Sequence, residues 1–115
     1  MRVYLAGPIT GHADLNRPAF EAAARWAQEH GWTPVSPLDA DPQHDGPCPP
    51  GLLETGATGS HSRACWLRVG LAALLTCDAI VLVDGWEHSA GALLEYRVAI
   101  ACGLVIRHAP VEVAA

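Results

Sequence analysis

The chain has 115 residues, half of them hydrophobic, and a formal net charge of −5 at pH 7. This length suits one domain built around one core, and no apolar run approaches the roughly 20 residues that cross a bilayer. All seven basic residues are arginines spread along the chain, without the clustered basic footprint of a nucleic-acid groove. The composition predicts a soluble protein that binds neither nucleic acid nor membrane. The first residues read as a strand rather than a secretory signal, and the cysteines described below fit a reducing cytoplasm.

The first half of the chain predicts strand, helix, strand and a long loop. Residues 2–6 form a short apolar run that ends at a glycine, and residues 16–30 follow with the spacing of an amphipathic helix. Residues 32–36 read as a second strand. Residues 37–61 are rich in proline and glycine, so they predict a long loop. Since loops of this length are uncommon in compact domains, we interpret it as either a lid over a site or a surface loop.

The second half repeats the alternation. A helix is expected at 63–76, an apolar strand without alternation at 79–83, a helix at 89–102 and a short strand at 104–106. The alternating order predicts an α/β fold, a doubly wound parallel sheet of four to five strands of the flavodoxin or Rossmann kind, in one domain over 1–115. Ligands of such sheets bind outside the carboxyl ends of the strands.

The four cysteines form no C-x-x-C pair, and we expect small buried thiols rather than disulfides or zinc ligands. They are Cys48, Cys65, Cys77 and Cys102. A metal site built from His44, Cys48, His61 and His88 matches no known ligand spacing, so no metal is expected.

Two loops rich in glycine and small polar residues follow strands of the predicted sheet. The first holds Gly7, Pro8, Ile9, Thr10 and Gly11, and the second, at 84–91, contributes Trp86, Ser89, Ala90 and Gly91. Glycine permits close backbone approach to a phosphate or sugar, and the N–H groups that begin a helix favour an anion. Ser89 is also a natural N-cap, so its presence has either a structural or a binding explanation.

Glu95 is the most informative single residue. Its neighbours on the same helical face are small or apolar and none is basic. Such a carboxylate is either a boundary residue or a group turned towards a site. It lies six residues after Ser89, which is about 9 Å along a helix axis, a span compatible with a sugar phosphate.

Two stretches of the sequence carry a family resemblance: Val-Tyr-Leu-Ala-Gly-Pro-Ile-Thr-Gly at 3–11 and Cys-Asp-Ala-Ile-Val-Leu-Val-Asp-Gly-Trp-Glu-His-Ser-Ala-Gly-Ala-Leu-Leu-Glu at 77–95. Together they resemble the nucleoside 2-deoxyribosyltransferase-like superfamily, in particular its small DUF4406 branch. The resemblance covers nearly the whole chain except the 37–61 loop. It implies that Glu95 is the nucleophile and that Tyr4 orients it. It also implies that Ser89 contacts a 5′-phosphate and that the 7–11 loop forms the opposing wall of the pocket.

One departure from the family pattern concerns an acid that handles the nucleobase. Counting back eight residues from Asp78 gives Gly70, so the acid is missing unless Asp39, Asp41 or Asp45 supplies it. We expect Asp78 itself to end the preceding helix.

The resemblance implies an N-glycosidase that cleaves the base–sugar bond of a (deoxy)nucleoside 5′-monophosphate. Glu95 must then be ionised, so its surroundings should not raise its pKa far, and a hydrogen bond from Tyr4 favours the charged form. No cofactor is expected. The alternatives are a nucleoside deoxyribosyltransferase and a non-catalytic nucleotide sensor. We also expect a homodimer, because Trp66, Leu104 and Val105 leave apolar area to cover.

Overall fold

Four parallel strands form the frame on which the helices pack. The computed structural model describes residues 1–39 and 63–111. The strands are β1 (Arg2–Ala6), β2 (Thr33–Val35), β3 (Ala79–Leu82) and β4 (Val105–His108), in the order β2-β1-β3-β4. β1 pairs with both β2 and β3, with Tyr4 beside Val35 on one side and Ile80 on the other. The carboxyl ends of all four strands therefore point the same way.

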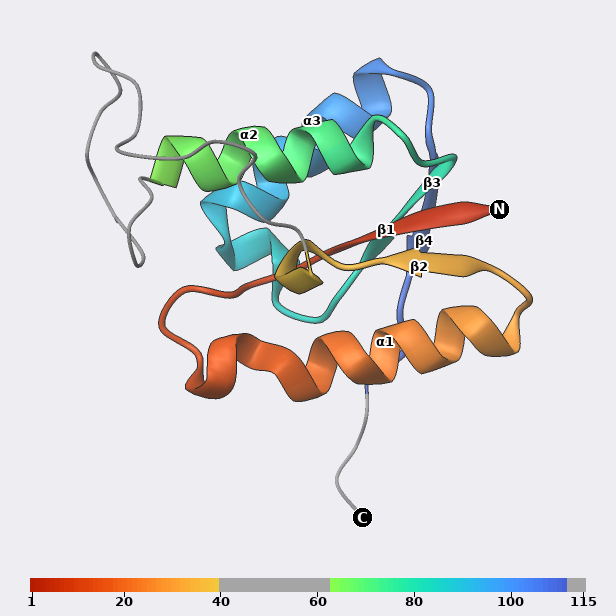
Figure 1. Cartoon of the computed structure of the whole chain (residues 1–115), viewed down its shortest axis with the longest axis horizontal. Helices are drawn as coiled ribbons and strands as arrows, with labels where there is room; N and C mark the ends of the chain where they lie inside the picture. Colours follow the sequence, from red (N-terminus) through yellow and green to blue (C-terminus); the bar gives the residue numbers. More distant parts are fainter. Residues whose placement is uncertain (40–62, 112–115) are drawn as a thin grey trace.

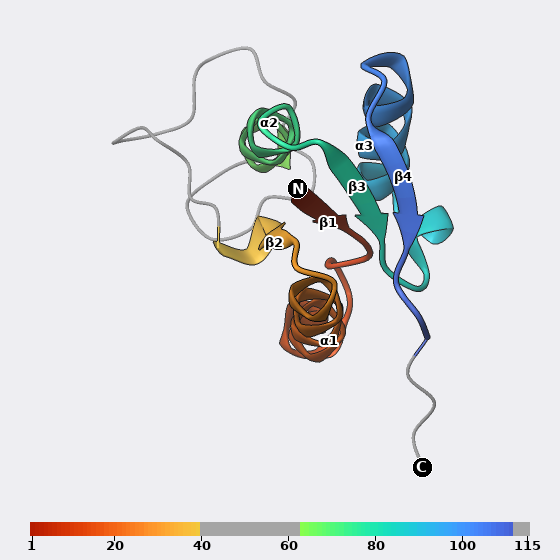
Figure 2. The ribbon, with the colours of Figure 1, turned by 90° about the vertical axis from the view of Figure 1, so that its right-hand side faces the viewer.

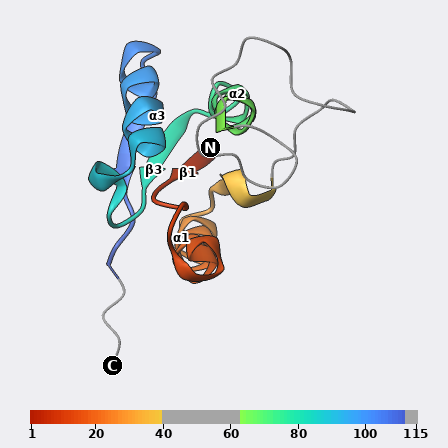
Figure 3. The same cartoon turned by 90° about the vertical axis from the view of Figure 1, so that its left-hand side faces the viewer.

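Helices cover both faces of this sheet, as the sequence predicts for a doubly wound fold. α1 (Arg17–Glu29) lies on one face, while α2 (Arg63–Leu74) and α3 (Ala90–Ala101) lie on the other (Figures 1 and 2). Figure 3 shows the same helices on either face of the sheet, from the side opposite to that of Figure 2. Strand side chains alternate between the faces. Val3 and Leu5 join the core under α1, whereas Tyr4 and Ala6 join the core under α2 and α3.

The predicted strands and helices are confirmed, with ends that differ by one or two residues. Three short 3-10 turns add to them: η1 (Ala13–Asn16), η2 (Pro37–Asp39) and η3 (Trp86–His88). η1 contains three successive left-handed residues at 14–16. The side-chain amide of Asn16 donates a hydrogen bond of 2.9 Å to the carbonyl oxygen of Pro8, which ties this turn to the end of β1. The rest of the predicted 37–61 loop lies outside the described residues.

The cysteine prediction is confirmed for two residues and wrong for a third. Cys65 and Cys77 are buried, whereas Cys102 is exposed because it lies at the C-cap of α3. Cys48 lies outside the described residues.

In the described part of the chain, no helix is long and apolar enough to span a membrane.

Candidate functional site

A buried tyrosine and a buried glutamate form a hydrogen-bonded pair between the sheet and the two helices above it. Tyr4 is fully buried in the middle of β1, and its hydroxyl donates to Oε2 of Glu95, which is 8% exposed. The two residues are 91 positions apart in sequence. Glu95 comes from the middle of α3, on the face that also holds the buried Ala92 and Ala99. The fold therefore brings together the two residues expected to act as nucleophile and orienting group.

Burial dominates the ionisation of this pair. Loss of water around Glu95 raises its pKa to about 7, although the hydrogen bond from Tyr4 acts in the opposite direction. Burial, with the nearby Glu95 carboxylate, also raises the pKa of Tyr4, so its hydroxyl stays protonated and remains a donor. The expectation that the pKa of Glu95 is not raised far is therefore wrong, because desolvation outweighs the single hydrogen bond.

The two carboxylate oxygens of Glu95 have different surroundings. Oε2 accepts from Tyr4, while Oε1 accepts no hydrogen bond from the described residues. Glu95 as a whole is 8% exposed. A carboxylate that is held through one oxygen can use its other oxygen as a nucleophile.

Gly70 of α2 faces the pair directly. A Cβ built on Gly70 would lie 2.9 Å from Oε2 of Glu95 and 2.9 Å from the hydroxyl oxygen of Tyr4. The position at which the family pattern expects an acid is thus at the site, but it carries no side chain. Asp39 lies exposed in η2 and has no recorded contact with Glu95, while Asp41 and Asp45 lie outside the described residues.

Asp78 has a structural role other than the one expected. Its carboxylate accepts a hydrogen bond of 2.9 Å from the backbone N–H of Arg2. α2 ends four residues earlier, at Leu74. Asp78 therefore fixes the start of β1 beside β3 instead of ending the helix.

The N-terminus of α3 lies six residues before Glu95. Ser89 is its N-cap, and the Ser89 hydroxyl oxygen accepts a hydrogen bond of 3.2 Å from the N–H of Ala92. A hydroxyl that accepts one hydrogen bond can still donate its own proton. Within the described residues, the N–H groups of Ala90 and Gly91 have no recorded acceptor. Capping and anion binding by Ser89 are therefore compatible.

The two predicted loops meet at the carboxyl ends of β1 and β3. A Cβ on Gly7 would lie 2.7 Å from Cβ of Val83, so only glycine allows these chain segments to approach so closely. Gly85 has a φ of +86°, and its Cβ position lies 3.2 Å from Cγ of Pro8. Close packing is a sufficient explanation for both glycines, independent of any ligand.

The remaining residues of the loops differ in exposure. Pro8 is buried and Ile9 is half-buried against the core under α1, while Thr10 and Gly11 are exposed. Trp86 packs its ring against Tyr96, with ring centroids 4.8 Å apart. Of this set, Thr10 and Gly11 are the most exposed, while Ile9 and Trp86 are half-buried.

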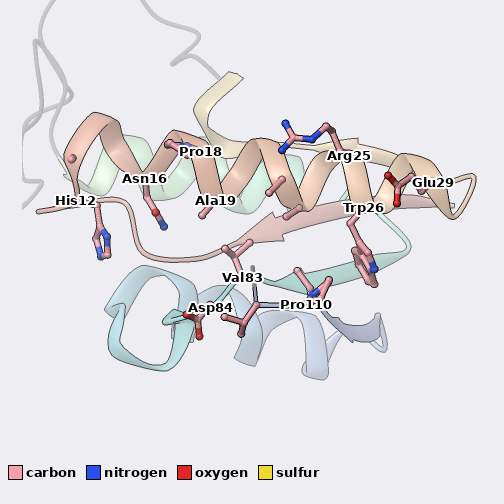
Figure 4. Close-up of a pocket in the computed structure, with 15 residues that line it drawn as sticks. His12, Asn16, Pro18, Ala19, Arg25, Trp26, Glu29, Val83, Asp84 and Pro110 are labelled. Atoms are coloured by element: carbon pink, nitrogen blue, oxygen red, sulfur yellow. The ribbon is translucent and has the colours of Figure 1, made fainter. Parts of the chain in front are cut away.

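A groove of about 600 Å³ opens on the other face of the sheet (Figure 4). It runs between α1 and the segment after β4, with Trp26 and Glu29 near one end and His12 and Asp84 towards the other. Val83, which lines it, belongs to the core under α1, whereas Tyr4 belongs to the opposite core. The sheet therefore separates the groove from Glu95, and we place the candidate site at the buried pair, where a titratable group is anchored.

No group of three or more possible metal ligands occurs among residues 1–39 and 63–111. Of the histidines and the cysteine considered for a metal site, only His88 lies in this part of the chain.

Sequence and structure comparisons agree on the kind of fold. The sequence model of the family described as "Domain of unknown function (DUF4406)" matches residues 1–108. A 2-desoxiribosyltransferase from Leishmania mexicana has a similar structure, with a TM-score of 0.61 and 21% sequence identity over 93% of this chain. The chain spans 62% of the length of that protein. No curated protein matches the sequence.

Proposed function

Because the chain belongs to the family described as a domain of unknown function, DUF4406, which by itself names no reaction, we propose from the site that it is an N-glycosidase acting on a (deoxy)nucleoside 5′-monophosphate. The observation that carries the proposal is the buried Tyr4–Glu95 pair, in which the Tyr4 hydroxyl anchors one carboxylate oxygen of Glu95. The fold shared with a 2-desoxiribosyltransferase supports a base–sugar bond as the target.

In the proposed reaction, Oε1 of Glu95 attacks C1′ of the sugar. The C1′–N bond breaks through an oxocarbenium-like transition state, and the base leaves with the bonding electrons and takes up a proton from solvent. The resulting glycosyl ester is hydrolysed by water, as in retaining glycosidases. Tyr4 holds the carboxylate in place and stabilises its charged form through the hydrogen bond to Oε2. The reaction as written uses neither a metal nor a cofactor.

We propose that the 5′-phosphate binds at the N-terminus of α3. The Ser89 hydroxyl and the N–H groups of Ala90 and Gly91 are neutral donors that suit an anion in an acidic protein. The site lies on the same helix as Glu95. Exposed Thr10 and Gly11 are proposed to complete the pocket from the first loop, with Gly7, Pro8 and Ile9 behind them and Trp86 fixing the second loop.

Base release tests the reaction. Wild-type protein incubated with a panel of nucleoside and deoxynucleoside 5′-monophosphates should liberate free base from at least one of them, detected by mass spectrometry. Glu95→Gln should lose this activity while keeping the fold, because a neutral amide is a poor nucleophile. Retention of more than a few per cent of the wild-type rate by the variant would remove Glu95 from this role.

A nucleotide-binding protein without turnover is the second candidate. It is favoured by Gly70, which places no acid beside the pair, and by the raised pKa of Glu95, which leaves much of the carboxyl protonated at pH 7. Saturable binding of a monophosphate without release of base would support this candidate. Transfer of the sugar to a second nucleobase instead of to water would indicate a deoxyribosyltransferase.

A further inference from the structure

We infer that Gly70 is a positioning residue for Glu95: the bare backbone of α2 packs onto the Tyr4–Glu95 hydrogen bond, and a Cβ added at position 70 of this backbone would press on both oxygens. The contact itself is independent of the reaction, whereas its importance for catalysis rests on the proposed function.

The geometry is specific to this glycine. The Cβ that an alanine would add lies 2.9 Å from each of the two hydrogen-bonded oxygens, closer than Cβ atoms approach non-bonded neighbours. Gly91, on the facing helix, is different, since its nearest atom is a methyl group of Leu67 at 3.5 Å, which is ordinary contact. A methyl group at position 70 would therefore press on both members of the pair.

The two oxygens differ in how they can respond. Tyr4 is fully buried in the part of β1, residues 3–6, that is itself fully buried, so its hydroxyl has little room to shift. The Glu95 carboxylate ends a flexible side chain, and the residue is 8% exposed. We expect the carboxylate to move and the hydrogen bond to break, while the carboxyl group stays under α2.

Few other groups act on this pair. Among the described residues, Tyr4 is the one titratable side chain whose interaction shifts the pKa of Glu95. The charge of Cys77 in turn raises the pKa of Tyr4. Arg68 on α2 and Arg97 on α3 are exposed, and the β3 residues facing the helices are apolar. Because the Tyr4 hydrogen bond lowers the pKa of Glu95, breaking it should raise that pKa.

The first test follows the carboxyl group without any substrate. In protein labelled with 13C at the glutamate carboxyls, the Glu95 signal, assigned by its loss in Glu95→Gln, is titrated by NMR. Gly70→Ala should raise the midpoint, in the same direction as Tyr4→Phe, and Gly91→Ala should leave it unchanged. A folded Gly70→Ala protein with the wild-type midpoint would overturn the inference, whatever the protein's activity.

The second test covers a variant that folds poorly. Gly70→Ala should lower Tm by about 5 °C or more, as expected for an overpacked core. In the Tyr4→Phe, Glu95→Ala background both oxygens are gone, so the same substitution should cost little or raise Tm, because alanine suits a helix interior better than glycine. Gly91→Ala should change Tm by the same amount in the wild-type and in the double-variant background. An undiminished loss from Gly70→Ala in the double-variant background would also overturn the inference.

Discussion

The raised pKa of Glu95 couples the stability of the fold to pH. The folded pKa of about 7 exceeds the ordinary glutamate value of 4.5, so the folded state binds the proton more tightly than the unfolded chain. The stabilisation is therefore complete below pH 4.5 and is lost as pH rises through 7. A pKa shift of this size corresponds to a loss of roughly 2–3 kcal/mol in the free energy of unfolding between pH 5 and pH 8, at about 1.36 kcal/mol per pKa unit.

Urea unfolding of the wild type and Glu95→Gln at half-unit steps from pH 5 to pH 9 measures this coupling. Histidines and surface acids titrate in both proteins, so the difference in unfolding free energy isolates Glu95. Relative to the variant, the wild type should lose about 2–3 kcal/mol between pH 5 and pH 8, with a midpoint near 7. A difference that stays constant with pH, or that grows in favour of the wild type as pH rises, would refute the assignment of Glu95 as a desolvated carboxyl group.

Tyr4→Phe removes the hydrogen bond that lowers the pKa of Glu95, so the acid limb of base release should move to higher pH; an unmoved limb would separate Tyr4 from the ionisation of Glu95. Ser89→Ala should cost about 1 kcal/mol of stability through the lost cap. It should also weaken monophosphate binding roughly ten- to a hundredfold while barely changing nucleoside binding, and equal losses in calorimetry would leave Ser89 as a cap only. Val105 on the edge strand is 37% exposed, and we predict a homodimer in sedimentation velocity; a monomer at tens of micromolar would contradict this.

Much of the fold follows from local sequence signals. The run Ala79–Leu82 lacks alternation, and it is buried on both faces, as that pattern predicts. Ser89 precedes a helix as an N-cap should. The left-handed residues at 14–16 had no such signal, because this conformation is uncommon outside glycine. Asn16, the last of them, donates a hydrogen bond to Pro8, a tertiary contact that local sequence does not indicate.

The contact between Tyr4 and Glu95 was predictable from the sequence, whereas the pKa values of the two groups were not. The small and apolar neighbours of Glu95 on α3 indicated an unusual carboxylate, and the resemblance paired it with Tyr4. Neither indicates how much water remains around the carboxyl group, since that depends on how closely α2 packs over β1. The contact of Gly70 with both oxygens arises from the same tertiary packing, and counting residues could only suggest that position 70 is near the site.

The covalent intermediate tests the central claim most directly. Wild-type protein mixed with a cleavable monophosphate is quenched in acid within the first turnovers and digested with trypsin, which cuts after Arg68 and Arg97 and so isolates residues 69–97 with Glu95. We predict a fraction of this peptide with the added mass of the sugar phosphate, localised to Glu95 by fragmentation and absent from Glu95→Gln. Release of base at an undiminished rate by Glu95→Gln, with no adduct on the wild-type peptide, would contradict the account.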